Sequence, residues 1–296
     1  MKKADSGRKN SDRRSAANVV PTTGKLVICP TPLGNLEDIT LRTLRAMREC
    51  DVIFAEDTRV TINLLRHFEI DKPLRSFPEG ARDARLRELR RLLRDGKTVA
   101  IVSDAGMPGI SDPGTDLVRT GRECGASIDA LPGPSAVPAA LVLSGFDVST
   151  FRFEGFPPRK AGERRTYLAE FEEERSAVVW FEAPRRAIEL LRDIAQGMPH
   201  RRVFVLREYT KKFEQHILGT AEEVLREIDV PARGEFTLVL EGSHAKRRGA
   251  SLEAEKAIAF LLEHGVSAKD ASEALRLATG LSKNELYRAV LKVRPS

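Results

Sequence analysis

Three loops rich in glycine and proline are the parts of this sequence best suited to binding chemistry. They are PTPLGN at 30–35, SDAGMPGISDPG at 103–114 and LPGPSA at 131–136. Glycine lets a ligand approach the backbone closely and proline keeps a loop rigid, so each loop can present amide and carbonyl groups to a polar molecule. We expect the loops to form a preorganised cradle for a small polar ligand, with purely structural turns as the alternative.

Other familiar binding chemistries lack their motifs. The sequence has no GxGxxG after its first predicted strand and no GxxxxGK[ST], which disfavours a dinucleotide site and a P-loop. The five histidines show no metal-ligand spacing such as HExxH, so no metal is expected. Cys29, Cys50 and Cys124 form no CxxC pair and are interpreted as reduced thiols in or near a core.

The loops follow short apolar runs that alternate with stretches of helical periodicity. These runs are KLVIC at 25–29, DVIFAE at 51–56, TVAIVSD at 98–104 and ASIDALPG at 126–133. Such alternation is typical of a largely parallel sheet covered by helices. Because ligands bind at the carboxyl ends of strands in these sheets, the loops should lie along one edge.

A second α/β unit is predicted in the following part of the chain. Its strands are expected near FRFEG, SAVVWFE, RVFVLRE and EFTLVLEG; a linker-like GSHAKRRGAS and three helical stretches follow, with Ser267 and Ser282 as N-caps of the last two. We therefore expect a disordered basic tail at 1–24, α/β domains at 25–134 and 135–243, a linker at 244–250 and a helical, helix-turn-helix-like domain at 251–296.

The charge of the chain favours a polyanionic partner. The formal net charge is +6 and the isoelectric point is near 9.3. Besides the tail, basic residues gather in two clusters, namely Arg82, Arg85, Arg87, Arg90, Arg91 and Arg94, and Arg159, Lys160, Arg164 and Arg165. These clusters indicate RNA, with solvated helix faces as the alternative.

Membrane insertion and secretion are not indicated by the sequence. No apolar run approaches the roughly 18 residues of a membrane span, and the N-terminus has charges but no apolar leader segment. A cytoplasmic protein is expected.

A series of short motifs, taken together and in order, resembles the bacterial small-subunit ribosomal RNA methyltransferases that 2′-O-methylate a decoding-site cytidine, a branch of the tetrapyrrole methylase superfamily. The motifs are the three loops with AEDTR (55–59), WFEAPRR (180–186), REYTKKFE (207–214), RGEFTLVLEG (233–242), SAKDAS (267–272) and LSKNELY (281–287). The resemblance runs from about Lys25 to Val293. It implies two α/β domains with S-adenosylmethionine in a cleft between them, usually a homodimer, and 16S ribosomal RNA of the small subunit as the substrate.

The resemblance also assigns cofactor contacts, residue by residue. They are Pro32, Gly34, Asn35, Ser103, Asp104, Ala105, Gly106, Ser135 and Ala136 in the first domain, and Phe181, Glu182 and the weaker candidate Glu235 in the second. Glu182 has a simpler interpretation as well, as an ion-pair partner of Arg185 or Arg186 one helical turn on.

Catalytic candidates follow from the resemblance and from the demands of the reaction. Methyl transfer to a ribose hydroxyl requires alignment of the 2′-oxygen with the methyl group and help in removing its proton. Asp57 is expected to accept or orient the hydroxyl and Arg59 to hold a phosphate bidentately, with Glu208 and Lys211 as second candidates. Alternatively, Asp57 or Thr58 caps a helix and leaves Arg59 exposed.

The chain departs from the family after the strand near Leu74. There SFPEGAR places Pro78, Gly80 and Ala81 where relatives have a His- and Asn-containing stretch. A second departure lies in the 103–114 loop, where Met107 stands at a position at which relatives more often have Thr. Two other functions stay open: a tetrapyrrole C- or N-methyltransferase on the same fold, and a non-catalytic ribosome-binding protein.

Overall fold

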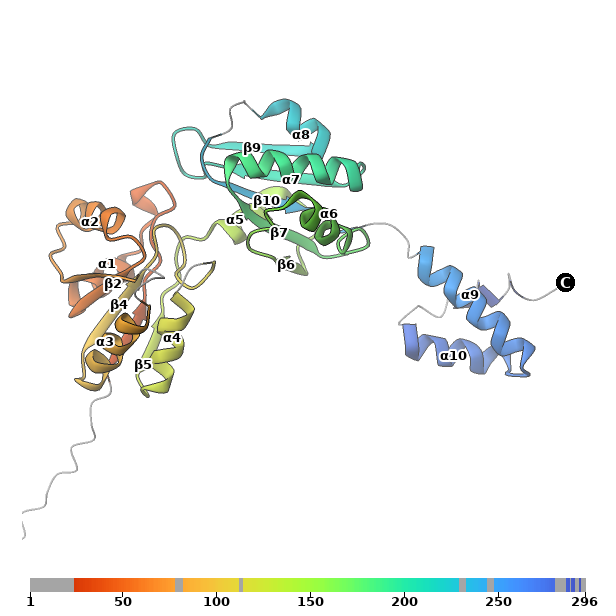
Figure 1. Cartoon of the computed structure of the whole chain (residues 1–296), viewed down its shortest axis with the longest axis horizontal. Coiled ribbons are helices and arrows are strands. Elements are labelled where there is room, and N and C mark those ends of the chain that lie inside the picture. Colours follow the sequence, from red (N-terminus) through yellow and green to blue (C-terminus); the bar gives the residue numbers. More distant parts are fainter. Residues whose placement is uncertain are drawn as a thin grey trace, which may run out of the picture. The chain divides into compact units, whose positions relative to one another are not determined.

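The computed structural model describes residues 24–77, 82–111, 114–228, 233–243 and 248–279, together with residues 286, 287, 289, 290 and 293. The chain divides into two compact units, Met1–Ala136 and Val137–Ser296, and each is described on its own (Figure 1). The predicted basic tail, apart from Gly24, and the departing residues Pro78, Gly80 and Ala81 lie outside the described residues.

The first unit contains a parallel sheet of five strands in the order β3-β2-β4-β1-β5. The strands are β1 Lys25–Ile28, β2 Val52–Ala55, β3 Leu74–Ser76, β4 Thr98–Val102 and β5 Ser127–Ala130. The helices between them are the 3-10 turn η1 Leu36–Asp38, α1 Leu41–Glu49, α2 Thr58–His67, α3 Arg82–Arg94 and α4 Gly114–Glu123. The predicted parallel sheet is confirmed.

Alternate residues of these strands pack on the two faces of the sheet. One face packs with Met47 of α1 and Leu65 of α2, and the other with Leu89 of α3 and Leu117 of α4. Each fully buried apolar side chain contributes about 1.5–3 kcal/mol, so both faces hold the strands and the loops that leave them. Cys29 is a free thiol in this core, and its burial raises its pKa to about 12.

The second unit contains a mixed sheet in the order β6-β7-β10-β8-β9, in which β6 and β7 are parallel and the other pairs are antiparallel. The strands are β6 Phe151–Phe153, β7 Ala177–Glu182, β8 Arg202–Arg207, β9 Gln215–Thr220 and β10 Phe236–Leu240. The helices are α5 Ala136–Ser144, whose first residue ends the first unit, α6 Ala161–Ala169, α7 Pro184–Gly197 and α8 Ala221–Glu227.

Two of these elements, β9 and α5, are absent from the predicted ones. QHILGT in β9 has few apolar residues, and AVPAALVLS in α5 is apolar on nearly every side, so neither shows a clear period. Tertiary contacts form them: β9 pairs with β8 along its whole length, and Val137 and Leu141 of α5 pack on the sheet in a cluster that includes Val179.

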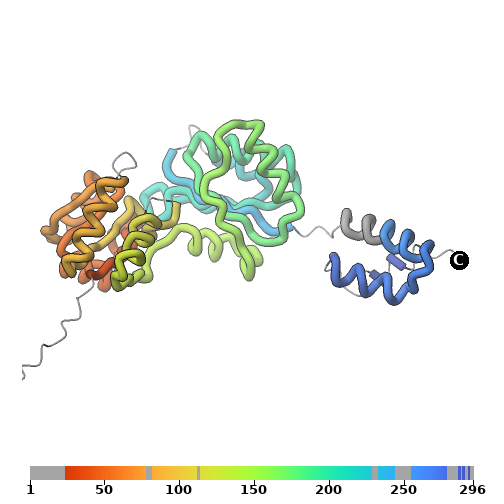
Figure 2. The backbone as a smooth tube through the Cα atoms, turned by 60° about the horizontal axis from the view of Figure 1, so that its bottom comes forward, coloured from red at the N-terminus to blue at the C-terminus, as the bar shows by residue number. Residues whose placement is uncertain are grey.

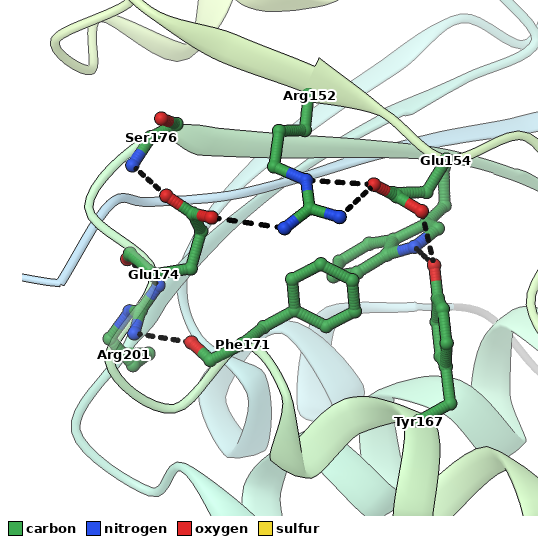
Figure 3. Close-up of polar contacts among 8 residues, drawn as sticks. Arg152, Glu154, Tyr167, Phe171, Glu174, Ser176 and Arg201 are labelled. Atoms are coloured by element: carbon green, nitrogen blue, oxygen red, sulfur yellow. Dashed lines mark hydrogen bonds and ion pairs between the residues drawn. The ribbon is translucent and has the colours of Figure 1, made fainter.

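A polar bridge at β6 shows how the second unit uses its charged residues (Figure 3). The Arg152 guanidinium lies between two carboxylates, with Nε 2.8 Å from Glu154 Oε1 and Nη1 3.1 Å from Glu174 Oε2. The buried Trp180 donates its Nε1–H to the Tyr167 hydroxyl at 2.8 Å, and that hydroxyl lies 3.3 Å from Glu154 Oε2. These contacts join the short strand β6 to the neighbouring core.

The C-terminal part of the second unit contains the helices α9 Arg248–Glu263 and α10 Ala268–Thr279, which pack against each other (Figure 2). The predicted N-cap Ser267 is confirmed, since its Oγ accepts the Asp270 N–H at 3.1 Å. Ile258 of α9 lies in a small core with Leu286, Ala289 and Val290. Ser282 lies outside the described residues.

Candidate functional site

The three predicted loops converge at the carboxyl edge of the first sheet. Because β1 is the neighbour of both β4 and β5 and all three are parallel, the loops that follow them leave the sheet side by side. Thr31 and Gly106 exchange two backbone hydrogen bonds of 3.0 Å each, and the Thr31 hydroxyl donates to Ser103 O at 3.1 Å. The prediction that the loops lie along one edge is confirmed.

Two glycines are required where these loops touch. Gly106 has a φ of +77°, and a Cβ there would lie 3.1 Å from Leu33 Cδ2. A Cβ at Gly133 would lie 2.7 Å from Pro30 Cβ. A side chain at Gly133 would push the first and third loops apart, and one at Gly106 would be strained by the left-handed backbone and would press on Leu33, so both glycines allow the loops to meet.

A cavity of about 720 Å³ opens beside these loops, and six predicted site residues line it. They are Pro32 and Gly34 from the first loop, Asp57 and Arg59 from the start of α2, and Ser103 and Asp104 from the loop after β4. Such a volume is in the range of small-molecule sites. The structure thus brings together residues that lie up to 72 positions apart in the sequence.

Asp57 and Arg59 form a closed ion pair at one wall of this cavity. Asp57 is the N-cap of α2, accepting the Arg59 N–H at 2.8 Å, as the capping interpretation predicted. Arg59 Nε and Nη2 also bind the same carboxylate, Nη2 at 2.6 Å from Oδ2, although the Arg59 side chain is 90% exposed. Hydrogen bonds from the Arg59 side chain and backbone lower the pKa of Asp57 to about 2.

The same aspartate is tied to the loop after β4. The Asp57 N–H donates to Asp104 Oδ1 at 3.0 Å, and the Asp104 N–H donates to Glu56 Oε2 at 3.3 Å. AEDTR and SDAG, whose Asp57 and Asp104 lie 47 positions apart, therefore form one hydrogen-bonded unit.

One face of α2 completes the cavity and was not predicted from the sequence. The residues at the i, i+3, i+4 and i+7 positions of that face line the cavity, and they are Val60, Asn63, Leu64 and His67. Leu36 of η1 also lines the cavity. The helical spacing was a usable signal, but the same spacing is equally typical of a face that packs on the sheet.

Glu208, Lys211 and Glu235 form a separate cluster in the second unit. Lys211 Nζ lies 3.1 Å from Glu208 Oε1 and 3.0 Å from Glu235 Oε2. Burial opposes the charge of Lys211, but the hydrogen bonds to Glu235 and Glu208 outweigh it and raise the pKa of the lysine. In Glu208, burial is likewise outweighed, by the Glu235 N–H and by Lys211, so its pKa is lowered.

Phe181 and Glu182 lie at the end of β7. Phe181 packs edge-on against Phe153, with ring centroids 5.0 Å apart. The Glu182 side chain is fully buried and lies 2.9 Å from Arg186 Nη2, so the expected partnership with Arg186 is confirmed. Burial raises the pKa of Glu182, against the effect of the Ala183 N–H and of Arg186.

Other predicted cofactor positions of the first unit have local roles in these loops. Asn35 caps η1 by accepting the Glu37 N–H at 3.0 Å. Ser103 Oγ lies 3.4 Å from Ala105 O and 3.3 Å from Gly106 O, which closes the turn after β4. Ser135 and Ala136 mark the start of α5.

Several residues of the predicted basic clusters form ion pairs with acidic residues of the protein. Arg164 is buried, with Nε 2.7 Å from Asp193 Oδ2, so its assignment to a surface that grips RNA is wrong. On α3, Arg82, Arg85 and Arg90 pair with Asp116, Glu88 and Glu123, whereas Arg87, Arg91 and Arg94 are exposed. Periodicity cannot reveal such pairing, because the acidic partners come from other elements or other turns.

The described residues contain neither a cluster suited to a metal ion nor a helix suited to crossing a membrane. Within residues 24–279, less the gaps given above, no group of three or more His, Cys, Asp or Glu is placed to hold a metal ion. Among the same residues, no helix is long and apolar enough to cross a membrane.

Comparison with known proteins gives consistent matches over most of the chain. Residues 25–225 match the model of the family described as Tetrapyrrole (Corrin/Porphyrin) Methylases. The ribosomal RNA small subunit methyltransferase I of Thermotoga maritima is 47% identical over 74% of this chain and 99% of its own length. The proteins of the same name from Neisseria meningitidis serogroup B and Halalkalibacterium halodurans are 39% and 36% identical, over 90% and 89% of this chain and 93% of each relative.

Solved structures with a similar fold have far lower sequence identity. Diphthine synthase has a TM-score of 0.58 at 14% identity, covering 74% of this chain and 90% of that one. Uroporphyrin-III C-methyltransferase from Thermus thermophilus, solved with S-adenosyl homocysteine, has a TM-score of 0.54 at 17% identity, covering 74% and 97%. The fold, the family match and the close relatives agree: this chain belongs to the tetrapyrrole methylase family and, within it, to the ribosomal RNA small subunit methyltransferase I group.

Proposed function

We propose that this chain transfers a methyl group from S-adenosylmethionine to the ribose 2′-hydroxyl of a cytidine in 16S ribosomal RNA of the small subunit. Its relatives at 36–47% identity are named ribosomal RNA small subunit methyltransferases. The observation that carries the proposal is one cavity lined both by backbone loops suited to a cofactor and by the Asp57 carboxylate.

The residues of the first unit fit the cofactor. Gly106 and Gly133 let the three loops meet without a steric clash, Gly34 lines the cavity without a side chain, and Asp104 adds a carboxylate that suits hydroxyl or ammonium groups. The contacts proposed there are Pro32, Gly34, Asn35, Ser103, Asp104, Ala105, Gly106, Ser135 and Ala136; those in the second unit are Phe181, Glu182 and Glu235. S-adenosylmethionine supplies an electrophilic methyl group on a sulfonium.

Asp57 is the proposed acceptor of a hydrogen bond from the ribose hydroxyl. Its pKa of about 2 keeps it ionised at every physiological pH, which suits orientation of the hydroxyl and makes it a weak base. We therefore assign Asp57 to positioning the oxygen and not to storing its proton.

Arg59 is the proposed phosphate ligand beside Asp57. Its guanidinium is exposed and already paired, so a phosphate oxygen would share it with the Asp57 carboxylate. Glu208 and Lys211 stay second candidates, because both are engaged with each other and with Glu235.

We further infer that the protein works in the cytoplasm as a homodimer and that RNA is its macromolecular partner. An RNA partner agrees with the net charge of +6 and with the exposed Arg87, Arg91 and Arg94 of α3. RNA binding should then weaken steeply as salt rises, and a flat response would count against these arginines as RNA ligands.

The test is transfer of labelled methyl from S-adenosylmethionine to small ribosomal subunits that lack the modification. The modified nucleotide is then identified by digestion and mass spectrometry as a ribose or a base methyl. A 2′-O-methylcytidine is expected. Incorporation into a base, or none despite cofactor binding, would contradict the proposal, and methylation of a tetrapyrrole instead would favour the other enzyme of this fold.

A further inference from the structure

The turn between β8 and β9, residues 208–214, is held by hydrogen bonds between its own residues. The Lys211 N–H donates to Glu208 O at 2.9 Å, and the Glu214 N–H donates to Lys211 O at 3.1 Å. The Thr210 N–H donates to Glu214 Oε2 at 2.6 Å. Backbone and side chains thus fix the turn from within.

The turn also contains strained backbone that its surroundings must hold. Glu208 and Thr210 have φ values of +48° and +62°, in the left-handed region that favours glycine. Glu208 is held there by its N–H bond to Glu235 O at 2.9 Å and by Lys211. Gly234 leaves the space that the Glu208 side chain occupies, and a Cβ there would overlap it.

Two residues of this fixed turn project into solvent. The Phe213 ring is 68% exposed, and Lys212, also exposed, places Nζ 5.7 Å from the ring centroid. By contrast, the neighbouring Tyr209 packs on the core of the sheet. The acidic and basic residues of REYTK therefore support a turn whose tip presents an aromatic ring and an ammonium group together.

We propose that Phe213 and Lys212 are a contact for single-stranded RNA, in which the ring stacks on a base and the ammonium binds the backbone phosphate. An aromatic ring beside a cation matches the two chemical features of a nucleotide, its flat base and its anionic phosphate. A protein partner would use the ring but would not need the adjacent positive charge. The assignment rests on the proposed function only in taking RNA as the substrate, and it assigns a role to two residues outside the proposed active site.

The first experiment compares Phe213→Ala with Phe213→Tyr and with Phe151→Ala, an exposed phenylalanine of β6 as the matched control. The readouts are the KM for small ribosomal subunits, the kcat, and the Kd for S-adenosylmethionine. Phe213→Ala should raise the KM about tenfold, because stacking on one base is lost, and leave cofactor binding unchanged. Phe213→Tyr and Phe151→Ala should behave like the wild type.

The second experiment measures binding directly, with a labelled single-stranded RNA of about 12 nucleotides, close to the site sizes of single-strand binders. Phe213→Trp adds a reporter to a chain whose one native tryptophan, Trp180, is fully buried. Stacking should quench the new fluorescence when RNA is added. Lys212→Ala should reduce the slope of log Kd against log salt by about 0.7, the value for one lost phosphate contact on a single strand.

The two experiments separate this inference from the proposed function. If subunits are methylated and Phe213→Ala changes neither KM nor RNA binding, the contact is wrong and the function stands. If no methylation occurs but the RNA arm shows the Phe213 and Lys212 effects, the function fails and the contact stands. A Phe213→Ala variant that changes from dimer to monomer in sedimentation would show that the ring meets a second copy, which also overturns the contact.

Discussion

The two units use their polar residues in different ways. In the first, the cavity is lined by residues of two loops at the edge of a parallel sheet and by α2, at whose start Asp57 and Arg59 form an ion pair with the arginine side chain 90% exposed. In the second, the candidate residues are engaged in ion pairs: Glu182 is fully buried against Arg186, and Lys211 bridges Glu208 and the exposed Glu235.

This difference separates the motif residues that can act on a substrate from those that stabilise the fold. A charged residue held by two partners and out of solvent stabilises its surroundings, whereas one at a cavity wall is available to a substrate. The first unit should therefore govern kcat and most of the cofactor affinity, whereas the paired residues of the second unit should govern stability and substrate affinity. Four measurements test that division, from the largest expected effect to the smallest.

The largest contrast is expected between Asp57→Ala and Lys211→Met in methyl transfer. Asp57→Ala should lower kcat about a hundredfold or more, because the acceptor hydroxyl loses its orienting partner. Lys211→Met keeps the apolar stem and removes the charge, and it should change kcat far less than Asp57→Ala. Circular dichroism and cofactor binding establish that both variants are folded. Equal losses of kcat would break the proposed division of labour.

The next effect concerns stability of the second unit. Arg186→Ala leaves the buried Glu182 carboxylate without its ion-pair partner, which should cost about 3 kcal/mol of unfolding free energy. Urea unfolding followed by Trp180 fluorescence reports on this unit, because Trp180 is the chain's one tryptophan and lies in its core. Arg226→Ala removes an exposed pair with Glu222 and should have no measurable effect. Similar losses in both variants would argue against a structural role for the buried pair.

A smaller, local effect is expected at the loops of the first unit. Gly106→Ala should weaken S-adenosylmethionine binding about tenfold, because the left-handed backbone disfavours alanine and its Cβ would press on Leu33. Gly125→Ala is the control: Gly125 has a φ of +69° but nothing within 4 Å of its Cβ position. Calorimetric titration should show normal affinity for Gly125→Ala. Equal weakening would mean that backbone strain alone, and not the cradle, affects the site.

The smallest effect is a shift in one pKa. Arg59→Ala removes the side-chain hydrogen bonds that are the largest cause of the lowered pKa of Asp57 and keeps the backbone N–H bond, so the pKa should rise from about 2 part of the way toward the ordinary 3.8. A lowered pKa stabilises the folded state above the unfolded value, and this stabilisation is lost as pH falls through the folded value. The variant should therefore lose less stability than the wild type as pH falls from about 5 to about 2. Carbon-13 NMR of the aspartate carboxyls measures the shift directly. An unchanged Asp57 titration would show that the pair does not persist in solution.

The loops and the sheet could be predicted from local features, whereas the residues added by tertiary contacts could not. Val60, Asn63, Leu64 and His67 have a helical spacing that fits either a cavity wall or a packed face, and only the position of α2 decides between them. The sequence places Arg164 in a basic cluster, whereas in the structure it is buried and paired with Asp193, 29 positions away. Linear charge patterns contain no information on such partners.

By itself, the sequence determined the alternation of strands and helices in the first unit, the parallel sheet that follows from it, and the meeting of three Gly- and Pro-rich loops at one edge. Those features depend on periodicity and on the common direction of parallel strands, both of which are local or follow from a general rule. The tertiary structure decided which charged residues form ion pairs within the fold and which line the cavity. Burial and pairing depend on neighbours brought together from distant positions, as when Lys211 meets Glu235, 24 residues away.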